Sequence, residues 1–219
     1  MTVFIADDHT LFRKGLIQIL EEDASLEIVG EAGDGQSAMD AIQKLQPDVA
    51  LIDIGMPDPN GLVIAETATQ NQWSTSIVIL TMYNEEEYLN KALDLGVKGY
   101  LLKENAVSDL MSCLHAVEAG RYYVSPVFSE FLVRRRARSV SLLSEYPMLD
   151  QLTNTELEVL RHVAENRTSR EIAEDLHISH RTVQTHRTNI CKKLGFSGHN
   201  KLLHFAIQHR ATLLDITRK

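Results

Sequence analysis

The chain has 219 residues, which is enough for one or two domains, and its composition is that of an ordinary globular protein. No apolar run approaches the roughly 18 residues that cross a bilayer. The N-terminal MTVFIADDHT has acids where a signal peptide needs basic and then apolar residues. Cys113 and Cys191 are too few for a disulfide scaffold. We therefore expect a cytoplasmic protein with no membrane segment.

The net charge of −8 conceals an asymmetry between the two halves of the chain. Residues 1–120 hold 20 Asp and Glu against 6 Lys and Arg, a net charge of −14. Residues 121–219 hold 10 against 16, a net charge of +6. Opposite charges indicate two domains with different partners and favour a polyanion for the second. Charge alone leaves open whether that polyanion is nucleic acid or a membrane surface.

The first 120 residues alternate short apolar runs with segments of helical spacing. The runs VFIA, LEIVGEA, VALID, IVILT and GYLL are typical of strands. The segments LFRKGLIQILEE and DGQSAMDAIQKL, one that ends at Asn71, and those at about 85–95 and 107–119 are typical of helices. Five strand–helix units predict an α/β fold with a doubly wound, five-stranded parallel sheet of the flavodoxin-like kind.

Five polar residues follow the ends of four of these strands: Asp7, Asp8, Asp53, Thr81 and Lys103. Ligands of parallel α/β sheets bind outside the carboxyl ends of the strands, so we expect these side chains to converge. Carboxylates so close repel one another unless a divalent cation is present, and Mg²⁺ prefers oxygen ligands. With a lysine and a hydroxyl nearby, the group is suited to hold a phosphoryl group. Each residue alone also has an ordinary structural explanation, and only their joint placement favours a site.

Residues 121–149 show no clean period and are interpreted as a linker with a helical part around Ser129–Arg138. The run RRRAR within it fits either a solvated linker face or a phosphate contact. From residue 150 the pattern is all helical, with four helices predicted at about 154–165, 169–176, 180–194 and 200–209. Thr153 and Thr168, each three residues before a glutamate, predict capping boxes, and Ser179 is a further N-cap.

The helices at 169–176 and 180–194 form a helix–turn–helix pattern. The second helix turns Val183, Ile190 and Leu194 to a core. Its opposite face is polar and basic, which suits a helix that enters the major groove of DNA. That face carries Arg181, Gln184, Thr185, Thr188 and Lys192.

The strand ends, the loop DIGMPDPNG and the segment KGYLLK resemble the receiver domain of bacterial two-component response regulators, over about residues 1–120. The resemblance implies that Asp53 accepts a phosphoryl group from a sensor histidine kinase. It further implies that Asp8, Asp53 and the backbone carbonyl of Gly55 bind Mg²⁺ directly, and that Asp7 acts through water. Lys103 would pair with the phosphate, Thr81 would hydrogen-bond it, and Tyr100 would rotate to follow Thr81.

The stretches IAEDLHIS, TVQTHRTNI and KKLG, within Leu152–Ala206, resemble the four-helix DNA-binding domain of the LuxR/NarL/FixJ class. Asn166 stands where that class usually has a loop glycine. The resemblance implies base contacts by Gln184, Thr185 and Thr188, with Arg187 a further candidate. It implies phosphate contacts by Arg170, Arg181, Lys192 and Lys193. It also implies dimerisation through part of the last helix, whose apolar stripe is Leu202, Leu203, Ala206 and Ile207.

The combined prediction is a receiver domain (1–120), a linker (121–149) and a LuxR-type helix–turn–helix domain (150–219). We expect a response regulator that binds double-stranded DNA, is not an enzyme, and dimerises or releases its recognition helix when Asp53 is phosphorylated. One alternative is a transcription factor of the same fold that is regulated without phosphorylation. Another is a phosphatase with an aspartate nucleophile, which the glycine at position 55 disfavours because such enzymes carry a second acid there.

Overall fold

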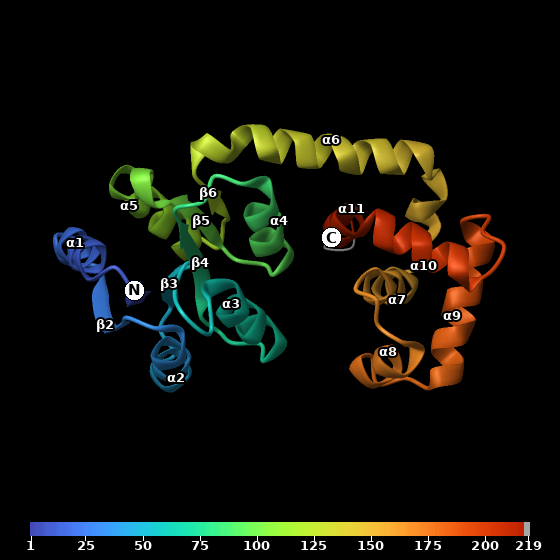
Figure 1. Ribbon diagram of the computed structural model, residues 1–219, viewed down its shortest axis with the longest axis horizontal. Helices are drawn as coiled ribbons and strands as arrows, with labels where there is room; N and C mark the ends of the chain where they lie inside the picture. Colours follow the sequence, from blue (N-terminus) through green and yellow to red (C-terminus); the bar gives the residue numbers. More distant parts are fainter. Residues whose placement is uncertain (217–219) are drawn as a thin grey trace. The chain divides into compact units, whose positions relative to one another are not determined.

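In the computed structural model, which describes residues 1–216, the chain divides into two compact units. The first unit is Met1–Glu130 and the second begins at Phe131. The first contains a parallel sheet, and the second is helical (Figure 1). Across residues 1–216 no helix is both long and apolar enough to span a membrane.

The first unit is built on a six-stranded sheet in which every paired strand is parallel. Its order β2-β1-β3-β4-β5-β6 reverses direction at β1, so the sheet is doubly wound, as predicted. All residues of β3 are buried, which explains why VALID reads as a continuous apolar run. The strands are β1 (Thr2–Ala6), β2 (Glu27–Ala32), β3 (Val49–Asp53), β4 (Ser76–Thr81), β5 (Gly99–Leu102) and β6 (Tyr123–Val124).

Helices cover both faces of this sheet (Figure 1). Alternate strand residues such as Val3 and Ile5 pack with Leu16 of α1 and Leu110 of α5 in one core cluster. Because side chains alternate across a strand, their neighbours supply the opposite face, where α2, α3 and α4 lie. The helices are α1 (Thr10–Glu21), α2 (Gly35–Leu45), α3 (Gly61–Gln70), α4 (Glu86–Asp94) and α5 (Ala106–Glu118).

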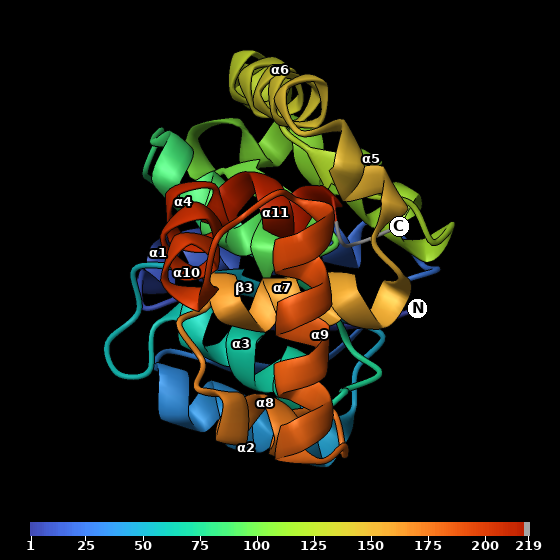
Figure 2. The ribbon, with the colours of Figure 1, turned by 90° about the vertical axis from the view of Figure 1, so that its right-hand side faces the viewer.

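The second unit contains the predicted helix–turn–helix as α8 and α9, which contact each other, and α9 also contacts α7. Figure 2 shows α9 in full, with α8 at one of its ends. Both predicted capping boxes are formed, at Thr153 with Glu156 and at Thr168 with Glu171, and Ser179 caps α9. The helices are α6 (Ser129–Glu145), which starts in the first unit, α7 (Asn154–Ala164), α8 (Ser169–Asp175), α9 (His180–Lys193), α10 (His199–Gln208) and α11 (Arg210–Ile216).

Three elements differ from the sequence prediction. The short β6 adds a sixth strand, α11 adds a helix after the four predicted ones, and α6 extends seven residues beyond Arg138. Leu142 of α6 is buried in the core of the second unit, with Tyr146 packed against that core. The segment 121–149 is therefore largely helical, and its two ends pack in different cores. The predicted domain boundaries at 120 and 149 stay a prediction.

Candidate functional site

Four side chains that could bind a metal gather at the carboxyl end of the sheet in the first unit. Asp7, Asp8, His9 and Asp53 each offer one ligand atom, and these atoms lie within 4.8 Å of one another. Asp7 and Asp53 are buried, whereas the side chain of Asp8 is 34 % exposed. The predicted convergence of the three acids is thus present in the fold. It forms because β1 and β3 are adjacent, parallel strands whose ends coincide.

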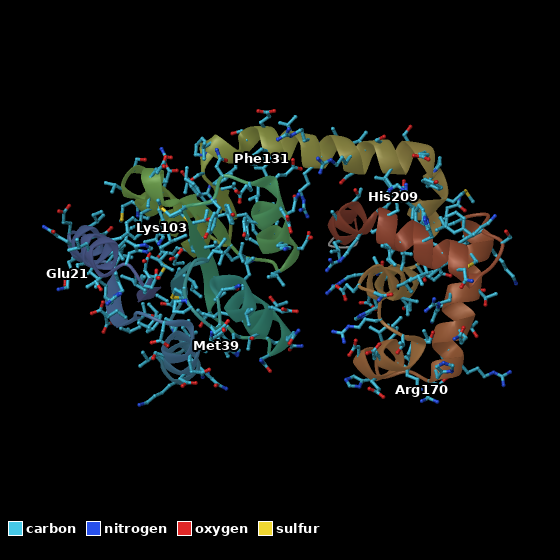
Figure 3. All side chains as sticks on the ribbon, viewed as in Figure 1. Glu21, Met39, Lys103, Phe131, Arg170 and His209 are labelled. Carbon is cyan, nitrogen blue, oxygen red and sulfur yellow. The ribbon has the colours of Figure 1, made fainter. Side chains whose placement is uncertain are left out.

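Lys103 lies between the two buried acids. Its Nζ is 2.8 Å from Oδ2 of Asp7 and 2.8 Å from Oδ2 of Asp53, and its side chain is only 4 % exposed. The aromatic ring of Phe12 packs 5.0 Å below the ammonium group. Figure 3 labels Lys103 within the sheet unit. One buried cation therefore bridges two buried anions, which leaves this trio with one excess negative charge.

The main chain around Asp53 is close-packed. Oδ1 of Asp53 accepts a hydrogen bond of 3.0 Å from the amide of Gly55. A side chain at Gly61 would place its Cβ 2.4 Å from the Asp53 carbonyl oxygen, so α3 can start against this strand end only with glycine. Burial raises the pKa of the Asp53 carboxyl, and the hydrogen bonds from Lys103 and Gly55 oppose that effect without cancelling it.

Thr81 and Tyr100 are both fully buried on neighbouring strands. Oγ1 of Thr81 accepts a hydrogen bond of 2.9 Å from the amide of Tyr83. The Tyr100 hydroxyl is buried and makes no hydrogen bond of regular geometry within residues 1–216, although the Thr81 side chain lies close enough to interact with it, and burial raises its pKa. Its ring meets Phe128 edge-on, with 5.0 Å between ring centroids. Tyr100 is therefore turned inward, toward the segment that precedes α6.

In the second unit, five of the eight predicted DNA-binding residues share one surface. They line a shallow depression along α9, together with Asn189, which the sequence analysis did not select. The Oγ1 atoms of Thr185 and Thr188 donate to the carbonyls of Arg181 and Gln184, one helical turn back. Arg170 is exposed on α8 and is labelled in Figure 3. The five predicted residues are Arg181, Gln184, Thr185, Thr188 and Lys192.

Two further predicted DNA-binding residues make contacts inside the protein. Nζ of Lys193 lies 2.6 Å from the buried carboxylate of Glu156 and donates to the Gln151 carbonyl at 3.0 Å. Arg187 is half-buried, and its Nη1 donates to Oγ of Ser169 at 3.2 Å. Both cations are thus engaged by the protein in the absence of DNA.

Sequence reasoning missed His9 and Phe12 at the acidic cluster. His9 Nδ1 is 2.9 Å from Asp8, and its amide donates to Asp7 at 2.8 Å. The position of His9 directly after two strand-end acids was the available signal. Phe12 gave none, because one aromatic residue in an amphipathic helix is usually core.

Comparison with known proteins decides the family. Residues 3–115 match the response regulator receiver domain, and residues 150–206 match the bacterial regulatory proteins of the luxR family. The oxygen regulatory protein NreC of Staphylococcus carnosus is 35 % identical over 218 residues, covering 98 % of this chain and all of the relative. The chain belongs to the two-component response regulators of the NarL/FixJ family. It is a DNA-binding transcription regulator and not an enzyme.

Solved structures of response regulators agree with this assignment. The RcsB–DNA complex matches with a TM-score of 0.58 and 30 % identity, covering 94 % of this chain and 96 % of that one. The isolated receiver domain of RcsB from Salmonella enterica serovar Typhimurium, with the phosphomimetic beryllium fluoride, matches with a TM-score of 0.57 and 31 % identity. It covers 60 % of this response regulator and 97 % of its own chain. The predicted receiver fold and helix–turn–helix domain are therefore confirmed.

Proposed function

We propose that Asp53 is the phosphoacceptor of this response regulator and that a sensor histidine kinase is the donor. The observation that carries this proposal is a buried carboxylate bridged by Lys103 and set beside two further acids. In the reaction, an Asp53 oxygen bonds to phosphorus while the phosphorus–nitrogen bond of the kinase phosphohistidine breaks. The electron pair of that bond stays on the imidazole, and the product is an aspartyl phosphate.

A divalent cation fits this site. Asp7, Asp8 and Asp53 supply carboxylate oxygens, the donors that Mg²⁺ prefers, and the Gly55 carbonyl would add a fourth oxygen. When bound, Mg²⁺ supplies positive charge that offsets the charge on the transferring phosphoryl group. The His9 Nδ1 atom lies 2.9 Å from Asp8, and we infer that His9 orients this carboxylate.

Phosphorylation would rearrange the residues around Asp53. Lys103 already contacts Asp53 and would pair with the new phosphate oxygens. Thr81 would donate its hydroxyl proton to one of them, which draws the loop after β4 inward. Tyr100 would turn with it, and its buried hydroxyl, which makes no hydrogen bond of regular geometry within residues 1–216, supports such a second position. Each new contact stabilises the phosphorylated conformation over the resting one.

The output is proposed to be base recognition by the exposed face of α9 in the major groove of DNA. Gln184, Thr185 and Thr188 are the proposed base readers. Since both threonine hydroxyls donate to the helix backbone, they present acceptor lone pairs and methyl groups to the bases. Arg170, Arg181 and Lys192 are the proposed phosphate contacts, which set register without reading sequence. The inward contacts of Arg187 and Lys193 support structural roles for both residues.

Activation is proposed to act through a homodimer on two DNA half-sites. Leu202 and Ala206 of α10 are buried in the domain core, whereas Ile207 on the same helix is 49 % exposed. An exposed isoleucine beside the buried residues of α10 supports the dimer contact that the resemblance to the LuxR/NarL/FixJ class implied. A tenfold gain in DNA affinity needs only about 1.4 kcal/mol of differential stabilisation, which one phosphate can supply.

The proposal is tested by measuring the affinity of the protein for a pool of genomic DNA fragments, with and without Mg²⁺ and beryllium fluoride. Beryllium fluoride on an aspartate mimics the acyl phosphate. We expect specific binding to tighten about tenfold or more in the wild type and not in Asp53→Ala. Asp58→Ala, which removes an exposed acid from the same loop, is the matched control and should respond as the wild type does. Specific binding that ignores beryllium fluoride would instead indicate regulation without phosphorylation.

A further inference from the structure

Ser169 lies beneath the proposed recognition surface and has no role in the functions described above. It is the first residue of α8 and is only 9 % exposed. Its Oγ accepts two hydrogen bonds from α9, one from Nε2 of Gln184 at 3.1 Å and one from Nη1 of Arg187 at 3.2 Å. The neighbouring Thr168 makes the helix cap, so the Ser169 hydroxyl serves α9 rather than its own helix.

The hydrogen bond to Ser169 restricts the side chain of Gln184. A glutamine amide has one acceptor oxygen and two N–H donors, and only one of these donors is used by Ser169. The oxygen and the second N–H remain, which are the two groups that read adenine in the major groove. Without this tether a glutamine on an exposed helix face samples several rotamers, each of which points the amide differently.

The second hydrogen bond holds Arg187 within the protein. The guanidinium is half-buried, its Nε has no hydrogen-bond partner within residues 1–216, and burial lowers its pKa. A guanidinium that swung outward would compete with Gln184 for the same bases, because arginine is the commonest reader of guanine. Ser169 thus fixes the amide of Gln184 at one turn of α9 and the guanidinium of Arg187 at the next.

We propose that Ser169 is a positioning residue for sequence readout, whose hydroxyl fixes the pose of Gln184 and retains Arg187 behind the recognition face. The proposal rests on the proposed role of α9 in base contact. It deepens that role by naming a residue outside α9 that sets specificity without touching DNA. The distinguishing signature is a change in base preference at the pair read by Gln184, with general DNA affinity retained.

The test measures Kd of the full chain, with beryllium fluoride, for the enriched fragment and for single-base variants across one half-site. Gln184→Ala should flatten the preference at one base pair by about 5- to 150-fold, the range for a bidentate contact. Ser169→Ala should flatten the preference at the same pair and add nothing when combined with Gln184→Ala. Affinity for unrelated DNA should change less than about twofold in Ser169→Ala, and Ser169→Thr, which keeps the hydroxyl, should retain the preference.

The matched control is the neighbouring residue. Arg170→Ala removes a proposed phosphate contact, so it should weaken binding to every sequence alike and leave base preference intact. A Ser169→Ala protein that behaves in this uniform way overturns the proposal. A Ser169→Ala protein that keeps its base preference, while Gln184→Ala loses it, also overturns the proposal. A Gln184→Ala protein with unchanged preference overturns the base-reading role of Gln184 itself, and the positioning role with it.

The tether can also be tested in the wild-type protein, without relying on a variant that folds. The side-chain amide of Gln184 should be nearly rigid in free protein by ¹⁵N relaxation, with an order parameter above about 0.6, and the amide of Gln208 on an exposed face of α10 should fall below it. Equal mobility of the two amides would contradict the tether.

Discussion

Asp53 illustrates how a functional residue is held at a cost to stability. Its carboxylate is buried beside another buried acid, and one lysine serves both. Burial raises its pKa, so ionisation of this carboxyl costs more free energy in the folded protein than in the unfolded chain. The penalty for ionised Asp53 is absent below the ordinary aspartate pKa and appears as pH rises through the raised value. At neutral pH the resting receiver is therefore strained by the group that makes it reactive.

Asp53→Asn should consequently stabilise the receiver at neutral pH. We expect the free energy of unfolding to rise by about 0.5–2 kcal/mol, the usual size of a stabilising substitution. The gain should disappear in acid, where the wild-type carboxyl is protonated in both states. Urea unfolding of the two proteins in EDTA at several pH values measures this difference. Asp58→Asn, at an exposed acid of the same loop, should show no such gain, and a constant effect of Asp53→Asn across pH would contradict the explanation.

Glu156 shows the opposite pH behaviour. It is 3 % exposed, and burial raises its pKa, but hydrogen bonds from Lys193 and from Thr153 outweigh burial and lower it. Its contribution to stability is thus present above the ordinary glutamate pKa and is lost as pH falls. Glu156→Gln should cost about 1.5–3 kcal/mol at pH 7, as expected for hydrogen bonds to a charged group.

Chemical denaturation of the second unit at pH 7 and near pH 4 tests this cost, which should shrink in acid. Glu171→Gln is the matched control, because Glu171 closes the other capping box at an exposed position without a lysine. Glu171→Gln should lose less free energy of unfolding than Glu156→Gln. An equal loss in the two variants would indicate that the stabilisation by Glu156 comes from its capping box and not from Lys193.

At the scale of elements, β6 and the turn after it connect the receiver to α6. The amide of Ser125 donates to the Tyr100 carbonyl at 2.9 Å, and its hydroxyl donates to Asp109 at 2.5 Å. Phe128, fully buried against the Tyr100 ring, lies one residue before α6 begins. A rotation of Tyr100 must therefore displace Phe128 or the turn that carries it. This contact joins Tyr100, the proposed switch residue, to the turn that precedes α6.

Phe128→Leu should weaken this coupling. We expect a stability loss of about 1 kcal/mol, since aromatic edge contacts contribute about 0.5–1.5 kcal/mol beyond buried area. The beryllium fluoride-induced gain in DNA affinity should fall, while affinity in its absence stays unchanged. Val127→Ala, at an exposed neighbour in the same turn, is the control for general disturbance. If Phe128→Leu keeps the full gain in DNA affinity on adding beryllium fluoride, the Tyr100–Phe128 contact does not transmit the signal.

The sequence predicts long, periodic elements well and short or buried polar features poorly. The strand ends that carry Asp53 and Lys103 follow from apolar runs and parallel topology alone. Asn166 adopts the left-handed φ of 60° that its position before α8 required. The two residues of β6 are too few to show a period, so that strand was missed. Ser169 was missed because a serine after a capping threonine reads as an ordinary helix start, and its partners are 15 and 18 residues away.

At the scale of the whole molecule, the receiver and the DNA-binding domain carry net charges of opposite sign. The residues up to 120 carry a net charge of −14 and those after carry +6, so attraction to DNA falls to the second unit. Within that unit the cations are not equivalent. Lys192 is exposed on the α9 surface, whereas the ammonium of its neighbour Lys193 is held by Glu156. The number of basic residues is therefore an upper limit on the number of ammonium and guanidinium groups available to DNA phosphates.

The salt dependence of DNA binding distinguishes these two adjacent lysines. Each phosphate contact contributes about 0.9 to the slope of log affinity against log salt concentration. Lys192→Met should reduce the slope by about one and weaken binding to all sequences alike. Lys193→Met should leave the slope unchanged, because its ammonium releases no counterion from DNA, but should lower the stability of the second unit as Glu156→Gln does. Titrations at four salt concentrations measure both slopes. A reduced slope in Lys193→Met would mean that the lysine leaves Glu156 on binding, and that the ion pair is exchanged for a phosphate.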